Sequence, residues 1–472
     1  MDAGLSLSCD TLIYTKDPSG EFIGFDLNKG FPSPGFQLGF PVIYGPHANA
    51  AAAVDGFLMI TPNGGRVELR RIDSTNVYEA ADSSYLQIKN NGDGTLLVRG
   101  TDGTSWSYTG TANGYRVTEI KDTNGNYITV TNDTAGRLQT VTDTLGRLFT
   151  VNYDTYHHPT SISQTRGGSQ YTWVTFGYTT VTVDLDFTSL YTVGISDNDT
   201  VPVLQTVGLP DGTYYKFEYN EYAQVKKVRY FAADSVSESH QLNYISNDLG
   251  SADSTAQTDC PRIGAISVLA ENWNLSGTTP QAVTTTFAAP TIEDCLGVTD
   301  FCQMTAVTAP DATEQRTYTI APGIWAYGLP VLEETWGLND SSTLIKQRWA
   351  TTNWTQDNLS VGYLINPRVT ETSVFDSSNQ KRTAISYQNL SVGCGSGCST
   401  DIHLPESVAE YAANATTVLR TTETDYLEST NYLDRRIIGL PVETRVYDGT
   451  NSGTLMAKTG LYYDETGDYL VS

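Results

Sequence analysis

The chain has 472 residues, and its 53 Asp and Glu against 28 Lys and Arg give a formal net charge of −25. At ~150 residues per domain, this length predicts roughly two or three domains. A hydrophobic content of 39% excludes a disordered chain, and no apolar run approaches the ~20 residues that span a bilayer. Because the acidic charge repels phosphate groups, we expect no nucleic-acid partner and no membrane span.

The chain has six cysteines: Cys9, Cys260, Cys295, Cys302, Cys394 and Cys398. Two short gaps, from Cys295 to Cys302 and from Cys394 to Cys398, are typical of loops closed by a disulfide. We therefore expect disulfides at these four residues, although spacing alone leaves the connectivity open. Zinc is the alternative at the second pair, since His403 is close in sequence, but the gap departs from the usual spacing of zinc ligands.

Disulfides form in oxidising compartments, so we expect the protein to be secreted or on the cell surface. The first residues, MDAGLSLSCD, carry neither the basic nor the apolar part of a secretory leader. A trimmed leader or another export route would account for this.

Short alternating apolar runs, bounded by Gly, Asn and Asp, recur along the chain, and almost no stretch has apolar residues at helical spacing. Runs at 57–60, 96–98 and 129–130 are flanked by turn sequences such as PNGG, NGDG and DTNGN. Their Gly and Asn residues can adopt positive φ. The pattern predicts an all-β protein built from strand, tight turn and strand.

An internal repeat with a period of 21 residues is visible after residue 119. The matching residues of two successive copies are Ile120, Asp122, Gly125, Val130 and Asp133, then Val141, Asp143, Gly146, Val151 and Asp154. A third copy begins with Ile162 and Gly167, and a more distant copy contains Val207, Gly212, Tyr215, Phe217 and Tyr219. A fixed period of this length indicates a repeat architecture.

One copy, residues 136–154, reads as a β-hairpin. Strand alternation places Phe149, Val151 and Tyr153 on one apolar face. A lone hairpin is marginally stable, but stacked hairpins pair every strand and join their apolar faces. In the more distant copy, we expect Phe217 and Tyr219 to be equivalent to Val151 and Tyr153. We interpret the recurrent polar and Gly residues as turn and inter-repeat bonding groups: Asp122, Gly125, Asp133, Gly136, Arg137, Asp143, Gly146, Arg147, Asp154 and Gly212.

The string G-R-L-x-x-V-x-D-x-x-G-R-x-x-x-x-x-Y-D, spelled by residues 136–154, resembles the YD repeat of the Rhs (rearrangement hotspot) family. Residues 209–220, 445–448 and 461–467 are similar to the same repeats. The resemblance is strongest over 115–230. It implies a YD-repeat array that forms a spiralling, shell-like antiparallel sheet. In bacterial Rhs proteins and the related toxin-complex components such a shell encloses a toxic C-terminal domain, and in teneurins a similar shell takes part in cell adhesion.

The sequence departs from the toxin-carrying members of that family. Those members usually end the shell with an Asp-Pro-containing self-cleavage motif and a variable toxin, and neither is found here. We therefore expect a piece of a longer array or a short relative.

The visibility of the repeat predicts four regions. Residues 1–56 are a Gly- and Pro-rich segment that forms a lid or plug, and residues 57–246 are the YD-repeat array. Residues 247–310 are a loop-rich excursion that contains cysteines. Residues 311–472 continue the array in degenerate form.

Few residues of the sequence are candidates for catalysis or metal binding. The pair His157 and His158 lies at the start of a repeat, where a turn role is favoured over metal binding. Glu333 and Glu334 near Trp336 could suggest a glycosidase acid beside a sugar platform, but the carboxylate separation cannot be read from sequence. The sequence has no nucleophile, zinc or phosphate-loop motif in context. We expect no enzyme activity, no cofactor and no metal.

The acidic strings 90–94 and 196–199 offer oxygen ligands for calcium, but neither fills the 12-residue calcium loop with its closing Glu. Turn formation is the favoured interpretation of both. The chain has 29 Tyr and 7 Trp residues, and exposed examples could bind glycans, although sheet packing is the more common role.

Three functions are compatible with these patterns. The first is a non-catalytic shell segment that encloses or carries a C-terminal cargo such as a toxin, with the rest of a longer chain or the cargo as its partner. The second is a secreted or surface adhesion protein that recognises a glycan or protein ligand. The third is self-assembly through an unpaired strand edge.

Overall fold

The computed structural model describes residues 5–17, 20–27, 29–49, 54–72, 75–187, 190–233, 241–248, 261–269, 282–295, 301–376, 379–395 and 397–463. Cys260 and residues 464–467 of the last YD-like stretch lie outside the described residues. The described part is all-β, with one four-residue helix, α1 (Thr430–Leu433), which confirms the predicted fold class. Within it, no helix has the length and apolar character needed to cross a membrane.

The N-terminal strands are β1 (Leu7–Cys9), β2 (Tyr14–Lys16), β3 (Phe22–Phe25) and β4 (Phe36–Leu38). The next strands are β5 (Val42–Asn49), β6 (Val54–Ile60), β7 (Arg66–Arg71), β8 (Val77–Ala80), β9 (Gln87–Asn90), β10 (Thr95–Arg99), β11 (Ser105–Thr111) and β12 (Gly114–Lys121). The clearest repeats form β13 (Tyr127–Asn132), β14 (Leu138–Thr142), β15 (Leu148–Tyr153), β16 (Pro159–Arg166) and β17 (Ser169–Thr182).

The middle of the chain forms β18 (Tyr191–Val193), β19 (Thr200–Gly208), β20 (Tyr214–Tyr219), β21 (Val225–Phe231), β22 (Gln241–Asp248), β23 (Ala265–Leu269), β24 (Val283–Phe287), β25 (Thr291–Asp294) and β26 (Phe301–Thr308). The C-terminal strands are β27 (Glu314–Ile320), β28 (Pro330–Leu338), β29 (Leu344–Thr355), β30 (Arg368–Asp376), β31 (Asn379–Gly395), β32 (Cys398–Tyr411), β33 (Val418–Tyr426), β34 (Pro441–Asp448) and β35 (Thr454–Gly460).

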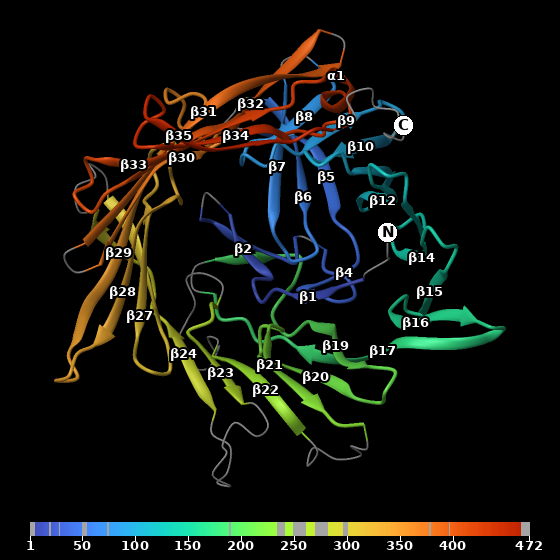
Figure 1. Cartoon of the computed structure of the whole chain (residues 1–472). Coiled ribbons are helices and arrows are strands. Elements are labelled where there is room, and N and C mark those ends of the chain that lie inside the picture. Colours follow the sequence, from blue (N-terminus) through green and yellow to red (C-terminus); the bar gives the residue numbers. More distant parts are fainter. Residues whose placement is uncertain are drawn as a thin grey trace.

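One large antiparallel sheet contains the strands from β5 to β35, and most of them pair with the next strand in sequence. β5 also pairs with β12, which closes the first part of the sheet on itself. β18 lies outside this sheet and pairs in parallel with β3. The sheet curves round so that its C-terminal strands return towards β7 to β10, and β1, β2 and β4 lie inside the curve (Figure 1).

The hairpins follow from the turn spacing and from alternation along each strand. In the register between β14 and β15, Val141 lies opposite Phe149, and between β15 and β16 Val151 lies opposite Ile162. Val151 and Phe217 are 4% and 8% exposed and belong to the same apolar cluster. The inner face of the curved sheet is therefore the apolar face of the repeats.

The N-terminal segment covers part of this inner face. Phe36 of β4 is fully buried, and its ring meets Phe217 edge-on with 5.0 Å between the ring centroids. Tyr14 of β2 is also fully buried and donates its hydroxyl to the backbone carbonyl of Tyr222 at 2.9 Å. These contacts across about 180 to 210 residues of sequence fill the inside of the curve with the protein's own N-terminus.

Disulfides join Cys295 to Cys302 and Cys394 to Cys398, and Cys9 is free. The first bridge joins the residue after β25 to Cys302 within β26, and the second closes the tip of the hairpin between β31 and β32. The described part of 247–310 also contributes strands β23 to β26 to the large sheet. The division of the chain into four regions stays a prediction.

Candidate functional site at the closing seam

Each turn of the clear repeats is built on an aspartate. Oδ1 of Asp143 accepts the backbone N–H groups of Leu145 and Arg147 at 3.0 and 2.9 Å, and its Oδ2 accepts Nε of Arg147 at 2.5 Å. Burial alone would raise the pKa of Asp143, but the backbone and guanidinium hydrogen bonds from Arg147 outweigh it and hold the pKa below its ordinary value. Gly146 completes the turn at φ 74°. These three hydrogen bonds to the Asp143 carboxylate all stabilise the turn.

The same turn recurs along the sheet with different side chains. An Asx side chain accepts backbone N–H groups two and four residues later at Asp122, Asp133, Asp154, Asn220 and Asn339. The left-handed position holds Gly125 and Gly136 in the first two of these turns, but His157, Ala223 and Ser342 in the other three. Gly212 has the same position in a turn that begins at Leu209 instead of an Asx residue.

Aromatic side chains along the sheet donate hydrogen bonds to backbone carbonyls of preceding strands. We call this series of hydrogen bonds the aromatic ladder. Tyr153 donates its hydroxyl to the carbonyl of Leu138 at 2.5 Å, and Tyr219 donates to the carbonyl of Leu204. The further members are Tyr178 to Pro159 at 3.0 Å, Trp354 to Pro330 at 2.8 Å, Tyr387 to Val369 at 2.7 Å, Tyr426 to Pro405 at 2.8 Å and Tyr463 to Pro441 at 3.0 Å.

The aromatic ladder has a regular geometry. Tyr178 directly follows a β-bulge and lies opposite Leu204, whose carbonyl accepts from Tyr219. Tyr387 likewise follows a bulge and lies opposite Pro405, whose carbonyl accepts from the next aromatic residue. A bulge re-aims the side chain that follows it. Burial raises the pKa of five ladder tyrosines above its ordinary value, so they stay protonated and can donate: Tyr153, Tyr178, Tyr219, Tyr387 and Tyr426.

The C-terminal part of the sheet contacts β7 to β10 along a line that we call the closing seam, between residues 70–103 and residues 357–438. Asn366 donates its backbone N–H to Ala81 at 2.8 Å, and Ile438 donates to Thr101 at 2.8 Å. Arg70 donates Nη1 to the carbonyl of Leu364 at 2.5 Å. These bonds join segments about 285 to 340 residues apart, and they close the curve of the sheet.

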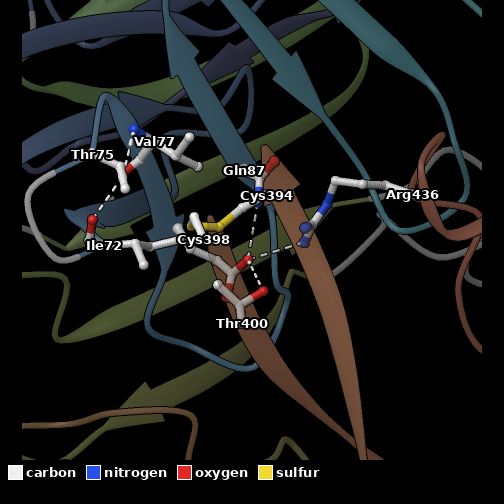
Figure 2. Close-up of a disulfide and its surroundings, with 9 residues drawn as sticks. Ile72, Thr75, Val77, Gln87, Cys394, Cys398, Thr400 and Arg436 are labelled. Atoms are coloured by element: carbon white, nitrogen blue, oxygen red, sulfur yellow. Dashed lines mark hydrogen bonds and ion pairs between the residues drawn. A yellow bond between two sulfur atoms is a disulfide. The ribbon is translucent and has the colours of Figure 1, made fainter. Parts of the chain in front are cut away.

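A buried ion pair lies at the centre of the closing seam. Nη2 of Arg436 lies 3.1 Å from Oε2 of Glu79 and also donates to the carbonyl of Tyr85 at 2.6 Å. Thr400 donates to the same carboxylate oxygen at 3.2 Å, and Gln87 donates to it at 3.5 Å. Figure 2 shows Gln87, Thr400 and Arg436 pointing towards one another beside the disulfide of the β31–β32 hairpin.

Burial sets the electrostatics of this ion pair. Arg436 is 1% exposed, and its Nε and Nη1 have no hydrogen-bond partner among the described residues. Burial raises the pKa of Glu79, although Arg436 opposes the shift, and burial lowers the pKa of Arg436. A buried pair of this kind is weak evidence for net stability, but loss of one partner leaves an uncompensated charge. A seam that closed out of register would therefore leave Glu79 or Arg436 as an unpaired buried charge.

Apolar side chains complete the closing seam. Tyr85 packs with Leu390, Val392, Ile402 and Leu433 in one buried cluster. The neighbouring His403 lies 2.7 Å from Asp357 through its Nε2. In the described part of the chain, no group of three or more His, Cys, Asp or Glu residues is arranged to hold a metal ion.

Glu334, which the sequence suggested as a glycosidase acid, is held by hydrogen bonds from neighbouring side chains. Glu334 accepts from Trp336 Nε1 and from Lys346 Nζ, each at 2.9 Å. Burial would raise the pKa of Glu334, but the hydrogen bonds from Lys346, Trp336 and Tyr318, together with the charge of Lys346, outweigh it and the pKa is lowered. Glu333 precedes it in the strand, so its side chain points to the other face. This geometry does not give the raised pKa that a general acid needs.

The acidic loops are engaged in turns. Oδ1 of Asp93 accepts both the backbone N–H and the hydroxyl of Thr95. Oδ2 of Asp199 accepts the backbone N–H of Ser196 at 2.7 Å. These contacts agree with the turn interpretation of the two strings.

The fold and the closing seam together define a β-shell: a curved antiparallel sheet of hairpins, closed by non-covalent contacts round an N-terminal segment. No protein-family model and no curated protein matches the chain. The solved structure of TcdB2-TccC3 matches with 10% identity and a TM-score of 0.28, covering 97% of this chain and 25% of that chain. TcdB2-TccC3-TEV matches with 10% identity and a TM-score of 0.25, covering 84% of this chain and 23% of that chain.

The chain thus spans about a quarter of the length of these solved structures. At TM-scores this low, the matches do not bear on what the chain does, which must be inferred from its own geometry.

Proposed function

We propose that the chain is a non-catalytic structural shell of the Rhs/YD-repeat type, which encloses or carries a cargo such as a C-terminal toxin domain. The observation that supports this most is the closing seam, because a buried ion pair between Glu79 and Arg436 joins the two ends of the curved sheet there. The repeats supply the wall, and the aromatic ladder fixes its strands. The two disulfides favour a secreted or cell-surface location.

Small-angle X-ray scattering of seam variants tests the shell. Arg436→Met should open the curve, so that the radius of gyration rises while far-UV circular dichroism stays that of a β-protein. Arg435→Met is the matched control, because within the described part of the chain the Arg435 side chain bonds locally, to the carbonyl of Asn431 at 2.9 Å. Arg70→Met removes a smaller part of the seam and serves if the first variant unfolds. Unchanged dimensions in both seam variants would contradict the proposal.

The cargo is tested by the size and location of the native polypeptide in source cells and medium. An immunoblot product much larger than 51.4 kDa supports a shell that continues into a cargo. A product of about this mass outside the cell contradicts the cargo and favours the adhesion function.

An adhesion or glycan-binding role is the second candidate, and one surface feature favours it. Tyr171 and Trp173 on β17 are partly exposed, with 4.8 Å between their ring centroids, and Arg166 lies over both rings. Exposed aromatic faces of this kind can bind sugars. Glycan-array binding that Trp173→Ala abolishes would support this role. Self-assembly stays the third candidate, because β35 is exposed along its length and pairs with β34 alone among the described strands.

A further inference from the structure

A cavity of about 220 Å³ lies between the N-terminal segment and strands β12 to β14, away from the closing seam. Lys29 lines it from the N-terminal segment, and Arg116 and Arg137 line it from the repeats. Three basic side chains round one cavity are notable in a chain with a net charge of −25.

Arg116 has unused hydrogen-bonding capacity at this cavity. Its Nε donates to the carbonyl of Gly136 at 3.0 Å, whereas its Nη1 is buried and has no partner among the described residues. Within the described part of the chain, no carboxylate forms an ion pair with this guanidinium. A buried guanidinium nitrogen without an acceptor costs free energy, and a ligand oxygen that reached it would remove that cost.

The packing round Arg116 fixes its position. Gly136 has φ 82°, and a Cβ added there would lie 3.0 Å from Nε and 3.2 Å from Cγ of Arg116. The arginine therefore lies flat over the repeat turn. Arg137 is held in the same turn by Asp133, with 2.6 Å between Nε and Oδ2. Lys29 forms no ion pair with any described carboxylate, although the nearby carboxyl of Asp26 interacts with its charge.

The rest of the cavity wall is mixed, with the amide side chains of Gln37, Asn113 and Asn132 beside an apolar group. The apolar group consists of Phe31, Leu38, Phe40, Val42, Val117 and Leu138. An apolar cavity of about 150 Å³ holds a benzene molecule, so the volume here suits a slightly larger body. Guanidinium groups bind carboxylate and phosphate oxygens with charge-assisted hydrogen bonds.

We propose that this cavity binds a small organic oxyanion, a carboxylate or phosphate monoester about the size of benzoate. The oxyanion lies against Arg116 and Lys29, and the organic body lies against the apolar wall. Because these two cations come from the N-terminal segment and from the repeats, the ligand would also tie the segment to the sheet.

Isothermal titration calorimetry of the full chain tests the site with benzoate and phenyl phosphate as probes. At least one should bind with one-to-one stoichiometry, and neutral benzyl alcohol should bind more than tenfold more weakly. Arg116→Gln should weaken binding at least tenfold, and Lys29→Gln several-fold. Lys29 is exposed, so its variant stays interpretable if the other fails to fold. Arg166→Gln, at a guanidinium outside this cavity, is the matched control and should bind as the unchanged chain does.

Three results would overturn this inference. The first is no saturable heat with either probe up to about 10 mM, a concentration well above a Kd of about 1 mM, the weak end of specific binding. The second is affinity equal to that of the unchanged chain in both the Arg116→Gln and the Lys29→Gln variants. The third is binding of inorganic phosphate as tightly as phenyl phosphate, which would show that the apolar wall contributes nothing.

Discussion

Tyr387 donates its hydroxyl to the backbone carbonyl of Val369 at 2.7 Å, from the position directly after a β-bulge. Tyr153 makes the same kind of bond to Leu138 in the clearest repeat. The aromatic ladder thus continues through strands whose sequence no longer shows the repeat, as expected if residues 311–472 continue the array in degenerate form.

Removing this hydroxyl should destabilise the sheet. In Tyr387→Phe the carbonyl of Val369 loses its side-chain donor, and we expect a loss of about 1 kcal/mol in the free energy of unfolding. Chemical denaturation measures the loss. Tyr127→Phe is the control, because Tyr127 is an exposed residue of β13 and its loss should stay within about 0.5 kcal/mol. Equal effects of the two changes would show that the ladder bond does not contribute.

Substitutions at two equivalent turn positions should change the stability of the protein in opposite directions. Gly146 has φ 74°, and a Cβ added there meets nothing within 4 Å, so Gly146→Ala should destabilise through backbone strain alone, by about 1 kcal/mol. His157 has φ 68° at the same place in the next turn. His157→Gly should therefore be neutral or stabilising, by up to about 1 kcal/mol. Thermal melting of both variants checks this, and the same sign for both would refute the equivalence.

The inner face of the repeats is tested by placing a charge on it. Val151→Asp and Phe217→Asp each bury an unpaired carboxylate, so both should lose several kcal/mol or fail to fold. Leu148→Asp is the control in the same strand, since Leu148 lies on the other face and is 48% exposed. Circular dichroism melting separates the outcomes. Wild-type melting of the Val151 and Phe217 variants would refute the register of the repeat.

The sequence is sufficient to predict what depends on near neighbours. Turn residues and alternation indicate the all-β fold and the apolar face that carries Val151, and the short gap between Cys394 and Cys398 indicates a bridge. The closing seam could not be predicted in this way, because Glu79 and Arg436 are 357 residues apart and belong to no repeat. The turn at His157 was visible only as a His pair, because a repeat search looks for Gly at the left-handed position.

The closing seam should give the protein a distinctive dependence on pH. Burial raises the pKa of Glu79 above its ordinary 4.5, so the folded state holds this proton more tightly than the unfolded chain does. Its contribution to stability is complete below pH 4.5 and is lost as the pH rises through the raised pKa. The turn aspartates, including Asp133, act in the opposite sense: their pKa is lowered, and their contribution is lost as the pH falls below the ordinary 3.8. The melting temperature measured from pH 4.5 upwards should therefore fall less steeply in Glu79→Gln than in the unchanged chain. An identical slope in the two proteins would mean that the pKa of Glu79 is not raised in the folded state.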